Sequence, residues 1–328
     1  MASSILLFAS LSKVHCSRGL LATGKRLFGL VQLRGLSLVP KPPARISAFK
    51  DFHRASVASL YSVGLIKRFR ECAGETLKVL LHEMSWTEAK EYFAKNDIVI
   101  LPVGSTEQHG PQNPLGTDFM IAKAIAEETA KRTRVLCLPA VPFGVSSHHK
   151  QFWGTIFISP RTLKEYVREA CLSLSYYGIR KIVIVNGHGG NLSVLTELAR
   201  ELRGEGMFMS VFQWWPAAAK LLPDLFMPEE RRHAGAEETS MNLALHTSVV
   251  NLSKAVDTEP RKHALQFEGI TLPLGTVDET GTGVFGKSTS ASVEKGEKVF
   301  QSVVSELVKH VTLLKNMKIE DLGQKPKV

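Results

Sequence analysis

The stretches 181-KIVIV-185 and 97-DIVILPV-103 decide the fold of this chain. Both are short runs of mostly β-branched apolar residues, without the alternation of a strand that is buried on one face only. Such runs are typical of strands covered on both faces, which occur in parallel sheets whose crossover helices pack on either side.

Further strands and helices alternate with these two along the chain. Helical spacing is clear between Pro160 and Tyr177, where six apolar or small residues share one face. The predicted strands are Asp97–Val103, Arg134–Pro139, Lys181–Val185 and Met207–Phe212. A first helix is predicted to begin near Ser85. The other predicted helices are Asp118–Lys131, with Asp118 as N-cap, Pro160–Tyr177, Asn191–Arg203, Gly235–His246 and Val293–Lys315. This order predicts an α/β fold, a three-layer α/β/α sandwich with a mainly parallel sheet.

The net charge of +10 is concentrated at the N-terminal end. Residues 1–85 hold 13 Lys/Arg against 4 Asp/Glu, whereas residues 86–328 hold 28 against 27. A groove for nucleic acid needs its positive charge in the folded part. We therefore expect no nucleic-acid partner.

Residues 1–50 contain eight basic residues and no Asp or Glu. This composition is typical of organelle transit peptides, although a disordered basic arm is the alternative. We expect a leader at 1–75, a hydrolase domain at 76–318 and a tail at 319–328, with localisation in a plastid or mitochondrion rather than the cytoplasm. No run reaches the roughly 20 apolar residues of a membrane span, so no membrane partner is expected.

Metal-binding residue types lie where the predicted strands end. Strand 97–103 leads into Gly104–Gly110, which contains Glu107 and His109, and strand 181–185 leads into Asn186–Asn191, which contains His188. Ligands of open α/β sheets bind beyond the carboxyl ends of the strands.

Asp118 and the pair Glu237–Glu238 open two helices and add carboxylates. The four cysteines form no C-x-x-C pair, so a metal here would take nitrogen and oxygen ligands. Two imidazoles and three carboxylates suffice for two Zn²⁺ or Mn²⁺ ions if one carboxylate bridges.

Each of these residues also has an ordinary explanation. Asp118 can be only an N-cap, Glu237 and Glu238 can complement a helix dipole, and His188 can be a satisfied turn histidine. The tryptophans Trp153, Trp214 and Trp215 are candidates for pocket walls, or ordinary core and surface residues. What favours a shared site is that three separate segments place such residues in loops leading into helices.

Several motifs, taken in order, make the chain resemble the creatininase (creatinine amidohydrolase) family. They cover about residues 85–316. The motifs are Leu101–Pro111 with Gly116–Asp118, Gly144–His149 with Gly154–Thr155, Asn186–Asn191, His233–Ser240, and a weaker Gly283–Gly286 with Ala291 and Glu294–Gly296.

This resemblance implies a metal-dependent hydrolase of amide C–N bonds, with two Zn²⁺ and/or Mn²⁺ ions, a small-molecule amide substrate and a homo-oligomer, often a hexamer. It assigns the metal ligands Glu107, His109, Asp118, His188 and Glu238, with Asp118 as the bridge. His233 and Glu238 are the candidate catalytic residues, and His233 is the candidate proton donor to the leaving nitrogen.

Three positions depart from the family pattern. Creatinine-cleaving members carry glutamate where this chain has Gly190, so Glu238 is the expected replacement ligand; Gln112 and His148 stand where many relatives have histidine and glutamate. The glycine variant occurs in relatives that act on formamides or peptides.

The alternatives are therefore a formamide hydrolase of riboflavin- or deazaflavin-type metabolism, or an inactive metal-binding subunit. A nucleotide-binding oxidoreductase is disfavoured because no G-x-G-x-x-G follows a strand.

Overall fold

The structure is a computed structural model, in which residues 78–323 are described. The predicted leader, residues 1–75, lies outside these residues. Within them, no helix is both long and apolar enough to span a bilayer.

A four-stranded, entirely parallel sheet forms the centre of the molecule, in the order β2-β1-β3-β4. The strands are β1 (Ile98–Val103), β2 (Leu136–Cys137), β3 (Lys181–Asn186) and β4 (Phe208–Gln213). The central pair runs in step, from Ile98 beside Lys181 to Val103 beside Asn186. The loops that follow β1 and β3 therefore start next to each other.

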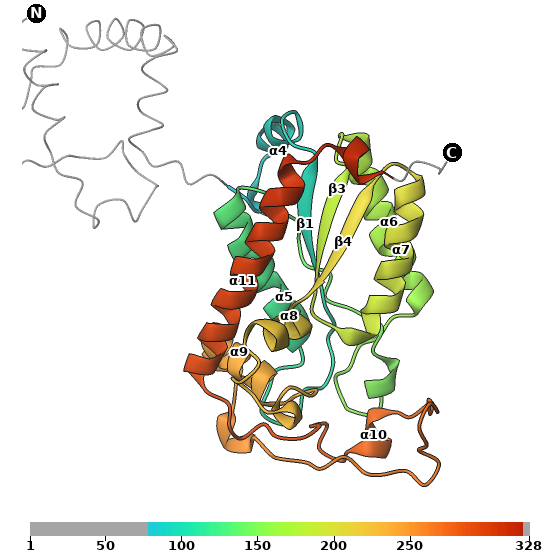
Figure 1. The fold of residues 1–328 in the computed structure, drawn as a ribbon, viewed down its shortest axis with the longest axis vertical. Helices are drawn as coiled ribbons and strands as arrows, with labels where there is room; N and C mark the ends of the chain where they lie inside the picture. The colour runs from blue at the N-terminus through green and yellow to red at the C-terminus, as the bar shows by residue number, and fades with distance from the viewer. Residues whose placement is uncertain (1–77, 324–328) are drawn as a thin grey trace, which may run out of the picture. The chain divides into compact units, whose positions relative to one another are not determined.

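Helices cover both faces of this sheet, which confirms the predicted three-layer sandwich (Figure 1). One layer contains α6 and α7, and the other contains α5, α8, α9 and α11. The bounds are α4 (Trp86–Phe93), α5 (Thr117–Thr133), α6 (Pro160–Tyr176), α7 (Leu192–Gly204), α8 (Trp214–Leu221), α9 (Ala236–His246), α10 (Thr276–Glu279) and α11 (Val293–Asn316).

Two apolar cores result, one on each face of the sheet. Successive side chains of a strand point to opposite faces, so Ile98 and Ile100 enter the core with α5 and α11 while Val99 and Leu101 enter the core with α6 and α7. This arrangement explains why β1 and residues 182–185 of β3 are apolar at every position.

Two sequence predictions need correction. Gly116, not Asp118, is the N-cap of α5, because the Asp118 carboxylate is turned toward His109 and His188. The predicted strand 134–139 shortens to β2, since Arg134 adopts a left-handed conformation (φ 56°) that ends α5, and Pro139 has no N–H to continue the ladder.

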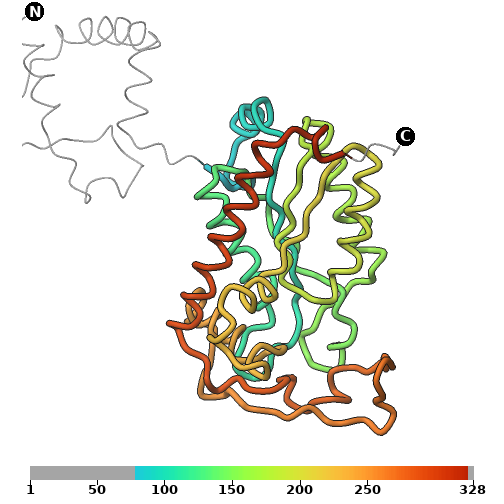
Figure 2. The backbone as a smooth tube through the Cα atoms, in the orientation of Figure 1, coloured from blue at the N-terminus to red at the C-terminus, as the bar shows by residue number. Residues whose placement is uncertain are grey.

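A long, largely irregular segment connects α9 with α11 and contains α10. It crosses the end of the molecule toward which the strands run, as the orange tube in Figure 2 shows. The segment thereby adds a wall to the region beyond the carboxyl ends of the strands.

Candidate metal centre

The structure brings all five predicted ligand side chains together beyond the carboxyl end of the sheet. Glu107 and His109 lie in the loop after β1, His188 follows β3, Asp118 is in the first turn of α5, and Glu238 is in the first turn of α9. The step-by-step pairing of β1 with β3 and the packing of α5 against α9 explain this convergence.

Asp118 stands in the middle of the cluster and turns one oxygen to each half of it. Its Oδ2 lies 3.1 Å from His188 Nδ1, which is also 3.2 Å from Glu107 Oε1. Its Oδ1 lies 3.0 Å from His109 Nε2, which is 3.8 Å from Glu238 Oε2. The five side chains thus form two three-residue groups that share one carboxylate.

Backbone carbonyls fix the orientation of both imidazoles. His109 Nδ1 donates to the carbonyl of Glu107 over 3.2 Å, and His188 Nε2 donates to the carbonyl of Val145 over 3.0 Å. In the neutral rings these protons leave the lone pairs of His109 Nε2 and His188 Nδ1 for a cation beside Asp118. Histidine ligands of metals are oriented in this way in proteins.

The facing groups are buried and lack hydrogen-bond partners. Both oxygens of Glu107, Oδ2 of Asp118 and Nε2 of His109 have no partner with hydrogen-bond geometry, and all three side chains are buried. Unpaired buried acceptors that face one another repel unless a cation or a proton lies among them. The donor set, imidazole and carboxylate without thiolate, fits Zn²⁺ or Mn²⁺.

The pKa shifts show how strongly the cluster attracts positive charge. Burial opposes protonation of His109, but Asp118, Glu238 and Glu107 raise its pKa to about 10. Burial likewise opposes the charge of Asp118, yet His109 and His188 lower the pKa of this carboxyl overall. Burial raises the pKa of Glu238 to about 7, against the influence of His109. Protons and metal cations therefore compete for the same atoms.

His233 reaches this centre from a strained turn. Ala234 has a left-handed backbone (φ 55°), its N–H donates to Glu238 Oε2 over 2.6 Å, and its carbonyl accepts from Gln112 Nε2 over 2.9 Å. Burial lowers the pKa of His233 well below its usual value, so its imidazole is neutral. His233 Nε2 lies 3.0 Å from the backbone carbonyl of Gln108 and 2.8 Å from the side-chain amide nitrogen of the same residue.

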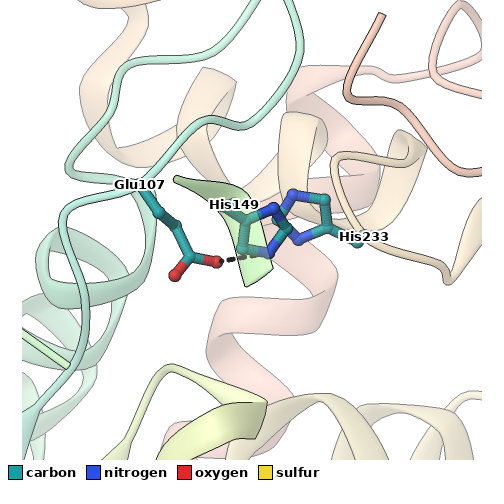
Figure 3. Close-up of side chains that lie close together, drawn as sticks. All are labelled: Glu107, His149 and His233. Carbon is teal, nitrogen blue, oxygen red and sulfur yellow. Dashed lines mark ion pairs between the residues drawn. The ribbon is translucent and has the colours of Figure 1, made fainter. Parts of the chain in front are cut away.

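His149 is a site residue that the sequence analysis did not single out, although it ends the Gly144–His149 motif. Figure 3 shows it stacked on His233 and directed at Glu107; the ring centroids are 4.5 Å apart and Nε2 lies 3.3 Å from Glu107 Oε1. The amide of Gln108 and the hydroxyl of Thr276 contact Nδ1 at 3.0 and 2.7 Å. Donation from the amide leaves the proton of His149 on Nε2, toward Glu107.

A cleft of about 420 Å³ opens onto this centre. Its walls include Trp215, Arg231, Glu237 and His148, whereas Trp214 belongs to the core and Trp153 is 98 % exposed. Of the three tryptophans considered from the sequence, only Trp215 lines this cleft.

Glycine at position 190 is required by the local backbone. A Cβ there would lie 2.2 Å from the carbonyl oxygen of Val145 and 2.6 Å from His188 Nε2. No larger residue fits without displacing the carbonyl that orients His188. A glutamate at this position would meet the same two groups, whereas Glu238 reaches the cluster from α9, 3.8 Å from His109 Nε2.

Comparison with known proteins agrees with this geometry. The pattern of the creatininase family, described as creatinine amidohydrolase, matches residues 82–311. The chain is 33 % identical over 229 residues to a mycofactocin precursor peptide peptidase of Mycobacterium tuberculosis, covering 65 % of this chain and 84 % of the relative. It is 30 % identical over 245 residues to the creatinine amidohydrolase of Pseudomonas putida, covering 69 % and 93 %.

A solved structure of a creatininase with Mn superimposes with a TM-score of 0.63 at 27 % identity, covering 73 % of this chain and 100 % of that one. A mutant creatininase of Zn–Zn type gives a TM-score of 0.62, also at 27 % identity, covering 73 % and 99 %. Sequence pattern, fold and the arrangement of the ligand-type side chains agree: the chain belongs to the creatininase family of amidohydrolases.

Proposed function

We propose that this enzyme hydrolyses the C–N bond of a small amide with two divalent ions, Zn²⁺ and/or Mn²⁺. Glu107, Asp118 and His188 would hold one ion, and His109, Asp118 and Glu238 the other. The observation that carries the proposal is that Asp118 directs one oxygen to each group, at 3.0 and 3.1 Å from an imidazole nitrogen.

When bound, two such ions polarise a carbonyl and lower the pKa of a water from 15.7 towards about 7. The residues of the chain orient the ions and move protons. Because His233 is half-buried in the cleft wall and neutral, it must first accept a proton from water and then pass this proton to the leaving nitrogen. The carbonyl and the side-chain amide of Gln108 both contact Nε2 of His233, so Nδ1 is the nitrogen left for this transfer.

Gly190 supports a substrate other than creatinine. The local backbone excludes the glutamate that creatinine-cleaving relatives carry there. A formamide is the second candidate, since the chain is also 28 % identical over 168 residues to a formylamino-pyrimidine deformylase of Methanothermus fervidus, covering 49 % of this chain and 61 % of that one.

Substitution of His188 tests the centre. His188→Ala removes an imidazole shared between Glu107 and Asp118, so we expect loss of bound metal and of hydrolysis, with the fold retained. Metal content by elemental analysis, with circular dichroism for folding, gives the readout. His310→Ala, on the exposed face of α11, is the control. Unchanged metal stoichiometry in His188→Ala would remove this residue from the centre.

A panel of creatinine, other cyclic amides, linear amides and formamides tests the reaction. Turnover of formamides but not of creatinine is the result expected from Gly190. Full metal content without turnover of any compound would instead support an inactive metal-binding subunit.

A further inference from the structure

A second cavity adjoins the cleft and is rich in cationic side chains. Its volume is about 650 Å³, and it shares Arg232, Glu279 and Phe285 with the cleft. Arg261 and Lys262 add two more cations to its wall. Either cavity alone is within the range that holds a drug-sized ligand, so together they exceed what a small cyclic amide needs.

The cations of this cavity are not neutralised by neighbouring carboxylates. Glu259 and Glu279 line the cavity, yet across residues 78–323 no carboxylate oxygen lies within ion-pair distance of Arg232, Arg261 or Lys262. By contrast, Arg231, the other arginine in the cleft wall, pairs with Glu237 at 2.5 Å. The three free cations therefore remain available to an anion.

Backbone pairing holds part of the cavity wall in place. Thr258 and Gly286 exchange two backbone hydrogen bonds of 2.7 and 2.8 Å, and Arg261 N–H donates to the carbonyl of Glu279 over 2.8 Å. One guanidinium nitrogen of Arg261, Nη1, donates to the carbonyl of Val277 over 3.2 Å. This bond anchors the guanidinium and leaves its other donors free for a ligand.

Phe285 connects the cavity with the reaction centre. It lines both cavities, and its ring meets His233 edge to face with centroids 6.0 Å apart. A ligand that lies beside His233 and extends past Phe285 would reach the second cavity, where Arg232, Arg261 and Lys262 line the wall.

We propose that this second cavity is a subsite for an anionic group, a carboxylate or a phosphate, on the part of the amide substrate remote from the scissile bond. The inference rests on the proposed amide hydrolysis and adds the substrate class to it: an extended, acidic amide. Arg232 and Lys262 are the specificity-determining residues.

Matched formamides test the subsite. The probes are N-formyl-γ-aminobutyrate, N-formyl-O-phosphoethanolamine and the neutral N-formyl-γ-aminobutyramide, with metal-loaded enzyme. The readout is the ratio of kcat/KM for each anionic compound to that for the neutral one. We expect both ratios to exceed one and to fall with added salt, because salt screens charge contacts. The larger of the two ratios shows whether carboxylate or phosphate is preferred.

Arg232→Gln and Lys262→Gln should each lower the ratio about threefold to tenfold, the range expected of charge contacts that stay partly open to water. Arg161→Gln and Lys309→Gln remove the same charges at exposed positions outside both cavities and should leave the ratio unchanged. Lys262 is exposed and makes no ion pair among the described residues, so its substitution leaves the fold intact. Equal ratios in the wild type and both cavity variants would overturn the subsite.

Direct binding separates this inference from the proposed reaction. Calorimetry with glutarate, glycerol phosphate and neutral glutaramide needs no turnover. One outcome is that the protein binds the anions selectively, that Lys262→Gln weakens this binding, and that no formamide is hydrolysed. This outcome would support the subsite and reject the proposed reaction. Hydrolysis without anion selectivity in either assay would retain the reaction and reject the subsite.

Discussion

At the scale of single residues, the centre depends on which nitrogen of each imidazole carries the proton. Val145 and Glu107 supply the carbonyls that decide this for His188 and His109. Loss of such an orienting partner typically lowers metal affinity 10- to 100-fold. The backbone around the ligand-type side chains is thus part of the candidate centre.

Gly190→Ala tests this dependence. The new methyl group would overlap the Val145 carbonyl, which must move and release His188. We expect metal affinity to fall about 10- to 100-fold, measured by competition with a chelator. Gly189→Ala is a matched control, because nothing lies within 4 Å of a Cβ at that position. Equal affinities in the two variants would contradict the orienting role of Val145.

Metal affinity should also depend on pH near neutrality. Glu238 binds a cation only as a carboxylate, and burial raises its pKa to about 7. Protonation below about pH 7 therefore removes a ligand, and affinity falls as pH falls. Metal content after equilibrium dialysis between pH 8 and pH 5.5 measures this change. A flat profile across that range would show that Glu238 is not a ligand.

Strand ends and glycine loops identified Glu107, His109 and His188, because ligands bind at the carboxyl edge of a parallel sheet. Helix starts added Asp118 and the pair Glu237–Glu238, and the family resemblance selected Glu238 from that pair. Sequence reasoning placed Asp118 as a cap, since an acidic residue at a helix start has that role by default. It did not single out His149 or Thr276, which meet only through the fold, 127 residues apart in the chain.

At the scale of elements, α11 is held at its C-terminal end by a lysine of the sheet. Lys181 is 2 % exposed, and its Nζ lies 2.6 Å from the carbonyl of Met317, 3.1 Å from that of Leu314 and 3.0 Å from Asp97 Oδ1. Helix C-termini leave carbonyls unpaired, and a buried ammonium both satisfies them and complements the helix dipole.

Lys181→Met should destabilise the fold by about 3 kcal/mol, because it leaves buried carbonyls and Asp97 without their partner. Urea denaturation followed by circular dichroism measures the loss. Lys309→Met, on the exposed face of α11, should change the free energy of unfolding by less than about 0.5 kcal/mol. If the two variants were equally stable, Lys181 would not anchor the helix.

The elements themselves were predictable where the apolar pattern is strong. Strands β1 and β3 and helices α6 and α11 agree with the predicted ranges to within one residue. Strand β2 was predicted too long, since its two ends are set by Arg134 and Pro139 rather than by hydropathy. The long segment before α11 carries no periodic signal, so its path across the sheet end was not predicted.

At the scale of the whole molecule, charge separates the N-terminal residues from the rest. Residues 1–50 hold eight basic residues and no acidic ones. We propose that residues 1–75 direct import into a mitochondrion or plastid. A fluorescent protein fused to these residues should collect in one of the two organelles, and replacement of the eight basic residues by glutamine should prevent this. An even cytosolic distribution of the unaltered fusion would reject the proposal.

We also propose that the enzyme is a homo-oligomer, as the family resemblance implies, with a hexamer as the first expectation. Sedimentation velocity of the metal-loaded protein measures the assembly. A single species with the mass of one chain, 36.1 kDa, would reject it.

The turn at Ala234 connects Glu238 with His233. A left-handed backbone at alanine costs on the order of 1–3 kcal/mol, and here the N–H of Ala234 donates a hydrogen bond to the Glu238 carboxylate. The same carboxylate lies 3.8 Å from His109 Nε2, so one side chain supports both the backbone that carries His233 and the cluster of ligand-type residues. Loss of Glu238 would therefore disturb the candidate proton carrier as well as the candidate metal centre.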